Sequence, residues 1–277
     1  MHTHTLTING QAIAYRESSG TGPAALLVHG NSSASSAFLP QLESPLGERY
    51  RLVAIDLPGH GQSDPAADPA ATYTLPGYAA VLRQAAEQLR LTDAVLVGWS
   101  LGGHIALEAS PDFPDAAGLC IFGTPPLAMP PAMEAAFLPH PAMGASFAAD
   151  LTEADALAYA TAFFRPGAAD VPAAVVETIR GTDGRARATL GASIATLTAK
   201  DEVALVAALK VPLAVIHGEE EQLINGAYFA TLPMPTLWRG AVQQIAGAGH
   251  APHWEQPEEF NRLLAAFIDD CNAARLK

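Results

Sequence analysis

The chain has 277 residues, of which 49% are hydrophobic and 16% charged, and its formal net charge is −13 at pH 7. This length and composition allow one sizeable core, and α/β folds of this size often form a single domain. The acidic balance argues against nucleic acid as a partner, because phosphate binding requires a basic face, and it disfavours an anionic membrane surface.

Cysteine usage and the first residues indicate the compartment. Cys120 and Cys271 lie far apart in the sequence, which argues against a disulfide framework and fits a reducing cytoplasm. The opening residues, MHTHTLTING, have neither a basic n-region nor an apolar h-region, so no secretory signal is visible. No apolar stretch approaches the roughly 20 residues that a membrane-spanning helix needs. We therefore expect a cytoplasmic protein that does not bind membranes, and nothing demands more than a monomer or a weak homodimer.

Short apolar runs alternate with longer amphipathic ones along the chain, which is typical of βαβ units around a mostly parallel sheet. Two runs, residues 5–9 and 12–16, predict an opening antiparallel hairpin. The further runs that predict strands are residues 24–28, 52–55, 94–97, 118–122, 212–216 and 242–245. The segments that predict helices are residues 76–89, the stretch after the 94–97 strand up to residue 109, and the end of the chain from residue 257.

The alternation of strand and helix patterns stops between residues 125 and 209, where no such strand is predicted and Ala, Pro, Met and Phe are frequent. We interpret residues 125–209 as a helical cap (lid) inserted late in the sheet, over its carboxyl edge. Open α/β sheets place their sites at that edge. Residues 1–124 and 210–277 then form the core domain.

The strongest chemical signal is GWSLGG at residues 98–103, a G-x-S-x-G between an apolar strand and a helix. In this nucleophile elbow the turn is too tight for side chains beside the serine, so Ser100 is strained but exposed. The N-terminus of the following helix aims the Leu101 N–H at a developing oxyanion. An accidental glycine-rich turn is the alternative, and the context on both sides argues against it.

A serine hydroxyl is a poor nucleophile unless a neighbouring base removes its proton. His250 lies in a loop of small residues after the last strand, and the chain order serine, acid, histidine is respected. His253 is the competitor. Because it follows Pro252 and precedes Trp254, we expect it at the rim of the site or at a helix cap.

The third member of a triad orients the imidazole and stabilises its charged form. The loop after residue 216 contains Glu219, Glu220 and Glu221, of which at most one has this role. A spacing of glycine, two residues and acid selects Glu221, with Glu220 as the alternative. The loop after the preceding strand, residues 122–126, contains no carboxylate.

The second oxyanion donor is expected from HGNSS at residues 29–33, with the backbone N–H of Asn31 as the candidate. The side chain of Asn31 either bonds the substrate or caps the next helix.

Other histidines receive no catalytic role. His60 lies in DLPGHGQSD, residues 56–64, which resembles a structural signature of the fold. His104, on the helix after the elbow, is expected to be packed or partly buried. His2 and His4 lack the further residues of a metal motif, so neither a metal nor another cofactor is implied.

Together these motifs resemble the α/β-hydrolase superfamily along nearly the whole core. More narrowly, HGNSS, GWSLGGHIALE, the GTPP of residues 123–126 and the TDGRAR of residues 182–187 resemble the metal-independent N-acyl-homoserine lactonases of that fold. The resemblance implies opening of the lactone ring of bacterial quorum-sensing signals without a metal. It also implies a glutamate as the acid, which agrees with Glu221.

The substrate contacts are expected around the nucleophile and in the cap. By this similarity, Tyr159 could reach the lactone with its hydroxyl, although it is equally interpreted as a core aromatic beside Phe163 and Phe164. The methionines of the cap supply adaptable apolar surface, either for an acyl chain or between cap and core. The residues predicted to contact substrate are Tyr159, Trp99, Met129 and Phe137.

The predicted function is a serine hydrolase that opens N-acyl-homoserine lactones through an acyl-enzyme. A general carboxylesterase acting on short acyl esters would use the same triad, and C–C bond hydrolases and cofactor-free perhydrolases share the fold. A ligand receptor built on a hydrolase scaffold is the alternative from another class. Ser100 excludes the dehalogenases and epoxide hydrolases, which place aspartate at the elbow.

Overall fold

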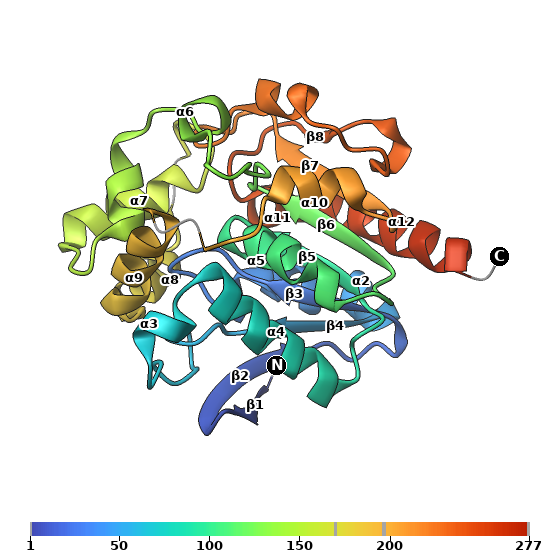
Figure 1. The fold of residues 1–277 in the computed structure, drawn as a ribbon, viewed down its shortest axis with the longest axis horizontal. Helices are drawn as coiled ribbons and strands as arrows, with labels where there is room; N and C mark the ends of the chain where they lie inside the picture. The colour runs from blue at the N-terminus through green and yellow to red at the C-terminus, as the bar shows by residue number, and fades with distance from the viewer. Residues whose placement is uncertain (1, 169–170, 196–197, 276–277) are drawn as a thin grey trace.

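The computed structural model describes residues 2–168, 171–195 and 198–275. Within these residues one sheet has the strand order β1-β2-β4-β3-β5-β6-β7-β8 (Figure 1). The β1–β2 and β2–β4 pairs are antiparallel and all others are parallel, which confirms the predicted hairpin and mostly parallel sheet. The strands are β1 (Thr3–Ile8), β2 (Gln11–Glu17), β3 (Gly22–Val28), β4 (Tyr50–Ile55), β5 (Val95–Trp99), β6 (Gly118–Phe122), β7 (Leu213–Gly218) and β8 (Gln243–Ile245).

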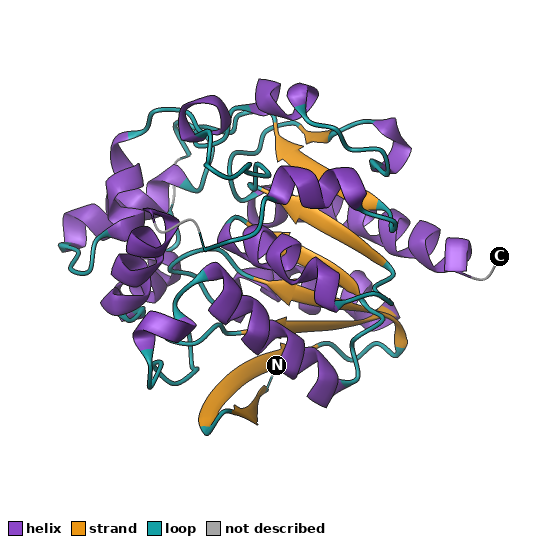
Figure 2. Cartoon of the chain, in the orientation of Figure 1, coloured by secondary structure: helices purple, strands orange, loops and turns teal. Residues whose placement is uncertain are grey.

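Helices flank the sheet on both faces (Figure 2). The α-helices are α1 (Leu39–Leu42), α2 (Pro45–Arg49), α3 (Pro69–Thr72), α4 (Leu75–Leu89), α5 (Leu101–Ala109), α6 (Met133–Ala136), α7 (Glu153–Ala162), α8 (Ala173–Gly181), α9 (Gly184–Ala195), α10 (Glu202–Ala208), α11 (Pro252–Glu255) and α12 (Pro257–Arg275). On one face α5 packs against α4 and α10, and on the other α12 packs against α1 and α11. The predicted helices correspond to α4, α5 and α12.

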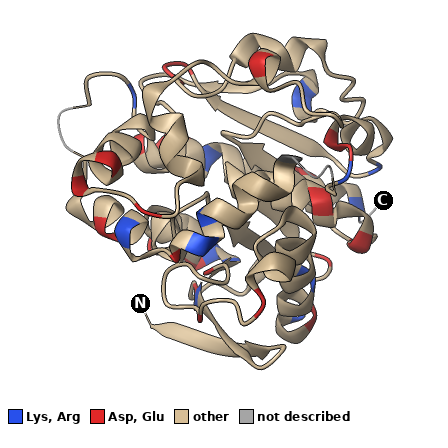
Figure 3. Cartoon of the chain, turned by 60° about the vertical axis from the view of Figure 1, so that its left-hand side comes forward, with Lys and Arg blue, Asp and Glu red and all other residues tan. Residues whose placement is uncertain are grey.

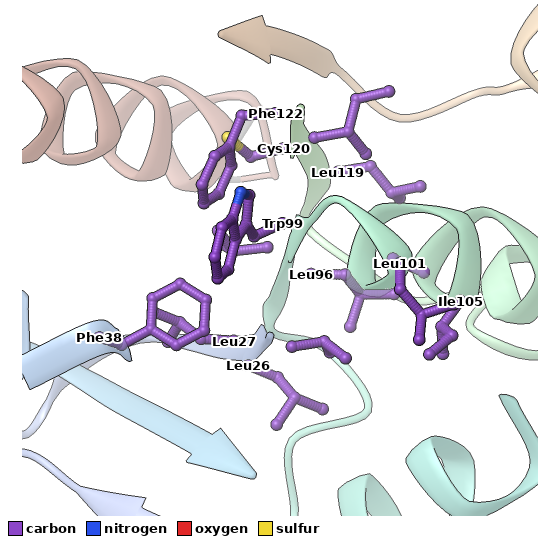
Figure 4. Packing of buried hydrophobic residues seen from close by; sticks show 14 of the residues in the cluster. Leu26, Leu27, Phe38, Leu96, Trp99, Leu101, Ile105, Leu119, Cys120 and Phe122 are labelled. Atoms are coloured by element: carbon purple, nitrogen blue, oxygen red, sulfur yellow. The ribbon is translucent and has the colours of Figure 1, made fainter. Parts of the chain in front are cut away.

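The central strands form because their residues suit burial on both sides. β3, β5, β6 and β7 contain no Lys, Arg, Asp or Glu, and the charged residues lie around them (Figure 3). Parallel strands covered by helices on both faces are near-continuous apolar runs for this reason. Figure 4 shows Phe38, Trp99 and Phe122 together on one side of the sheet, with Leu101 and Ile105 of α5 on the other.

Helices α6 to α9 lie beyond the carboxyl ends of the strands, at the left of Figure 1. α7 packs against α8 and against the 3-10 helix η3 (Pro141–Phe147), which also contacts α9. α10 falls inside the predicted cap by sequence but packs against α5, beside the sheet. The division of the chain at residues 125 and 209 stays a prediction.

The expected position of His253 at the rim is wrong. The short helix α11, which begins at Pro252, turns this side chain inward, where its exposed fraction is 0%. Its ring lies 4.8 Å from that of Trp99 and 5.0 Å from that of Phe122, between ring centroids. Neither ring nitrogen has a hydrogen-bond partner among the described residues. Burial, and secondarily the neighbouring His250, lower the pKa of His253 to about 3.

This buried imidazole makes the fold sensitive to acid. In the unfolded chain its pKa returns to about 6.5. Between pH 6.5 and the folded value the unfolded state therefore binds a proton that the folded state does not, so stability is lost as pH falls. We expect His253→Phe to reduce the loss of unfolding free energy between pH 7 and pH 5 by about 2 kcal/mol. Urea denaturation of both proteins at pH 7 and pH 5 measures this loss. If the loss of unfolding free energy is the same in His253→Phe as in the wild type, His253 is not buried in its neutral form.

Candidate active site

Ser100 occupies the turn between β5 and α5 with φ 52° and ψ −119°, in the positive-φ region that non-glycine residues rarely adopt. Its N–H donates to the Phe122 carbonyl at 2.9 Å, and its carbonyl accepts from Thr124 Oγ1 at 2.8 Å. A Cβ at position 102 would overlap the carbonyl oxygen of Val28, so glycine is required where α5 crosses β3. These contacts fix the strained turn from which the Ser100 side chain projects.

His250 and Glu221 form a buried pair. His250 Nδ1 lies 2.8 Å from Glu221 Oε2, and both side chains are 2% exposed. The other carboxylate oxygen accepts from the Leu223 N–H at 2.8 Å. Glu219 and Glu220 are exposed to solvent. Of the three consecutive glutamates, the structure brings only Glu221 to the imidazole.

The surroundings of Glu221 keep its carboxyl charged. Burial by itself raises the pKa of Glu221, but the charge of His250, its hydrogen bond and the Leu223 N–H together lower it below the ordinary value. Because a carboxylate only accepts hydrogen bonds, Nδ1 of His250 must carry a proton and donate it. In the neutral imidazole, Nε2 is therefore free to act as a base.

The His250 ring is enclosed by a glycine and two aromatic residues. Gly123 has φ +59°, and a Cβ there would come within 2.8 Å of the imidazole. Trp99 lies behind the pair, where its indole N–H donates to the His250 carbonyl at 2.8 Å. Phe163 contributes a ring 6.0 Å from the imidazole, between centroids. Trp99 thus holds the histidine loop and does not line the cavity in which Ser100 lies.

Ser100 and His250 line one cavity, whose volume is about 110 Å³. Among the described residues, the hydrogen bond of the His250 ring is the one between Nδ1 and Glu221, and none is formed to the Ser100 hydroxyl. Such bonds are often long without substrate and tighten in the complex. The arrangement can therefore support attack by a serine on a carbonyl carbon.

Leu101 and Asn31 line the same cavity, and neither backbone N–H has an acceptor among the described residues. The loop that carries Asn31 is held by the His29 ring, whose Nε2 accepts from the Leu57 N–H at 3.0 Å and whose Nδ1 donates to the Gly30 carbonyl at 2.8 Å. Burial lowers the pKa of His29 to about 4, which keeps this ring neutral. Two unpaired donors beside Ser100 are suited to an oxyanion.

The side chain of Asn31 does not cap the next helix, whose N-cap residue is Ala34. A bond from this side chain to the substrate stays a prediction. Its Nδ2 donates to the Ser146 carbonyl at 2.7 Å, and its Oδ1 accepts from the Ser32 hydroxyl at 3.1 Å. The amide therefore links the loop after β3 to the segment between β6 and β7.

Apolar residues form most of the cavity wall. Met129 and Phe137 line it, as do Met133 and Met143. Tyr159 also lines it, and its ring packs edge-on against Phe163 at 4.8 Å between centroids, so both interpretations of this residue describe part of its environment. Burial raises the pKa of the Tyr159 phenol, which stays protonated.

The buried charged residues include Arg187 and Glu202, to which the sequence motifs assign no role. Arg187, in TDGRAR, is 3% exposed and donates from Nε to the Ala148 carbonyl at 2.7 Å. Glu202 is 1% exposed and lies 2.9 Å from Nδ1 of His104. A signal for Glu202 is its position as the first residue after the helix cap Asp201, but only the fold brings it to His104.

The described residues contain neither a membrane-spanning helix nor a metal-binding cluster. No helix there is long and apolar enough to cross a membrane. No group of three or more His, Cys, Asp or Glu side chains there could hold a metal ion. His4 stacks on Tyr15 with ring centroids 5.2 Å apart, away from the cavity.

Solved structures with this fold include that of the N-acyl homoserine lactonase AidH complexed with N-butanoyl homoserine. This chain is similar to it at 38% identity and a TM-score of 0.93, over 98% of this chain and 97% of that one. A putative aryl esterase from Burkholderia cenocepacia has a TM-score of 0.80 at 23% identity and covers 98% of this chain and 100% of its own, which shows the fold alone.

Curated relatives cover different parts of the chain. An uncharacterized protein of Mycobacterium tuberculosis is 37% identical over 108 residues, which are 39% of this chain but only 30% of that protein's length. The pimeloyl-[acyl-carrier protein] methyl ester esterase of Methylococcus capsulatus is 32% identical over 264 residues, 91% of this chain and 97% of its own. The model of the alpha/beta hydrolase family matches residues 25–263. The chain therefore belongs to the alpha/beta hydrolase family.

Proposed function

We propose that this protein is a carboxylic ester hydrolase that opens the lactone ring of N-acyl-homoserine lactones, with Ser100, His250 and Glu221 as its triad. The observation that carries the proposal is the His250–Glu221 pair beside Ser100 at one apolar cavity. The similarity to the N-acyl homoserine lactonase AidH over 98% of the chain supports the substrate class.

The first step is attack on the lactone carbonyl. Nε2 of His250 takes the Ser100 proton as Oγ bonds to the carbonyl carbon, and Glu221 stabilises the imidazolium through Nδ1. The negative charge that develops on the carbonyl oxygen is stabilised by the N–H groups of Asn31 and Leu101. Their freedom from other acceptors supports this role.

Collapse of the tetrahedral intermediate breaks the bond to the ring oxygen, which takes the proton from His250. The released hydroxyl stays tethered, so the acyl-enzyme carries the whole opened substrate on Ser100. Water then gives a proton to His250 and attacks the ester carbonyl. Release of Ser100 with that proton yields the N-acyl-homoserine.

The cavity suits an uncharged acyl chain. Its wall is apolar around Met129, Met133 and Phe137, and flexible thioethers adapt to chains of different shape. Opening the lactone ring of these signals is quorum quenching. We place this activity in the cytoplasm, because a reducing compartment suits the free, buried cysteines Cys120 and Cys271.

A carboxylesterase acting on short acyl esters is the second candidate, favoured by the 32% identity to the pimeloyl-[acyl-carrier protein] methyl ester esterase. The same triad performs both reactions. They differ in the leaving alcohol, which departs from an ester and stays attached in a lactone.

Ser100→Ala removes the nucleophile and leaves the cavity in place. We expect it to lower kcat for N-hexanoyl homoserine lactone by about 10⁴-fold or more, because the triad acts as a unit. Proton release measures turnover, and calorimetry with the same lactone checks that binding persists. Retention of a substantial part of the wild-type rate would refute the role of Ser100.

Glu221→Gln and Glu220→Gln form a matched pair of neighbouring substitutions. Loss of the carboxylate that orients His250 should lower kcat by about 10³- to 10⁴-fold in Glu221→Gln. Glu220 is exposed, so its substitution should leave kcat within about twofold. The reverse ranking would assign the acid to Glu220.

A further inference from the structure

A second imidazole–carboxylate pair, His104 and Glu202, lines the cavity that contains Ser100. His104 lies on α5, four residues after Ser100, which is about 6 Å along the helix axis. Helical side chains lean toward the N-terminus of their helix, so the imidazole leans back toward the turn that carries Ser100. The imidazole therefore leans toward the end of the cavity at which Ser100 lies.

Both carboxylate oxygens of Glu202 are bonded to groups of the protein, and they hold His104 in place. The Glu202 side chain is 1% exposed, and both carboxylate oxygens lie 2.9 Å from Nδ1 of His104. Oε2 also accepts from the Leu127 N–H at 2.8 Å, while the Glu202 N–H donates to the Leu127 carbonyl at 2.8 Å. A carboxylate used in this way orients the ring and takes no ligand.

The geometry assigns the proton to Nδ1 of His104, because that nitrogen faces a group that only accepts. In the neutral ring, Nε2 is then an acceptor. It has no hydrogen-bond partner among the described residues and is not among their buried unpaired atoms. The His104 side chain is 12% exposed and lines the cavity, whose wall also includes the apolar residues Leu127 and Met129. Nε2 thus offers a hydrogen-bond acceptor inside a largely apolar cavity.

We propose that His104, oriented by Glu202, is a specificity-determining residue that accepts a hydrogen bond from the amide N–H of the N-acyl group. The inference rests on the proposed lactonase function. In these lactones the amide nitrogen is two bonds from the reacting carbonyl carbon, and its N–H is a donor that matches Nε2. The subsite selects acylamino-lactones over alkyl lactones, and Glu202 is its positioning residue.

The experiment compares N-hexanoyl homoserine lactone with its carba analogue, in which a methylene group replaces the amide nitrogen. Wild-type protein should have a kcat/KM about 10-fold or more higher for the amide, the effect of one hydrogen bond to a polar group that is otherwise left unpaired. His104→Leu should abolish this preference, so that the ratio of the two kcat/KM values falls to about 1, mainly through a higher KM for the amide lactone. His104→Gln, whose amide oxygen can accept, should restore part of the preference.

The outcomes separate the two proposals. Equal kcat/KM values for the two lactones in the wild type, or an unchanged preference in His104→Leu, would overturn the subsite and leave the lactonase in place. An equal loss for both lactones in His104→Leu would make the pair a structural clamp between α5 and α10. If the wild type opens neither lactone, the proposed function itself fails. The wild-type ratio tests the subsite even if His104→Leu does not fold.

Discussion

The sharp turn at Ser100 is the constraint on which the rest of the site depends. β5 must end and α5 begin within one residue, which requires a positive φ at Ser100 and a glycine at position 102 against β3. The same turn fixes the first N–H of α5 beside the serine and brings Gly123, after β6, against His250. A displacement of the turn would therefore disturb the proposed nucleophile, a proposed oxyanion donor and the proposed base together.

The segment that covers the cavity is tied to the loop that carries Asn31. The Arg187 guanidinium donates to the Ala148, Ala149 and Ile179 carbonyls and to the Ser32 hydroxyl. Asn31 itself donates to the Ser146 carbonyl. Asp183 accepts from the Tyr73 hydroxyl at 2.7 Å, which attaches the start of TDGRAR to the core. Breaking the bonds of a buried arginine with four acceptors costs free energy of folding. The TDGRAR motif therefore couples the segment over the cavity, which includes Ala148, Ala149 and Ile179, to the loop of the proposed oxyanion hole.

The sequence predicts the sheet well because its central strands are short apolar runs separated by turn residues. The eight strands found among the described residues lie where the pattern indicates. It also narrows the acid to two glutamates, but only the loop geometry brings Glu221 to His250. The sequence pattern cannot reveal that the side chain of His253, after Pro252, is buried in the core. Nor can it reveal that Glu202 bonds to His104, 98 residues earlier in the chain. The role of Trp99 is likewise not visible in the sequence. Its position beside Ser100 suggests substrate contact, whereas its indole N–H donates to the His250 carbonyl and supports the histidine loop.

We propose that the substrate is a lactone of the N-acyl-homoserine type. The most direct measurement is the rate of ring opening of N-butanoyl and N-hexanoyl homoserine lactone by the purified protein, followed by mass, beside hydrolysis of p-nitrophenyl butyrate. We expect kcat/KM for a lactone to be about 10⁴ M⁻¹s⁻¹ or more, the ordinary range for an enzyme acting on its own substrate. Hydrolysis of the ester with both lactones unchanged would contradict it and leave a carboxylesterase with the same proposed triad.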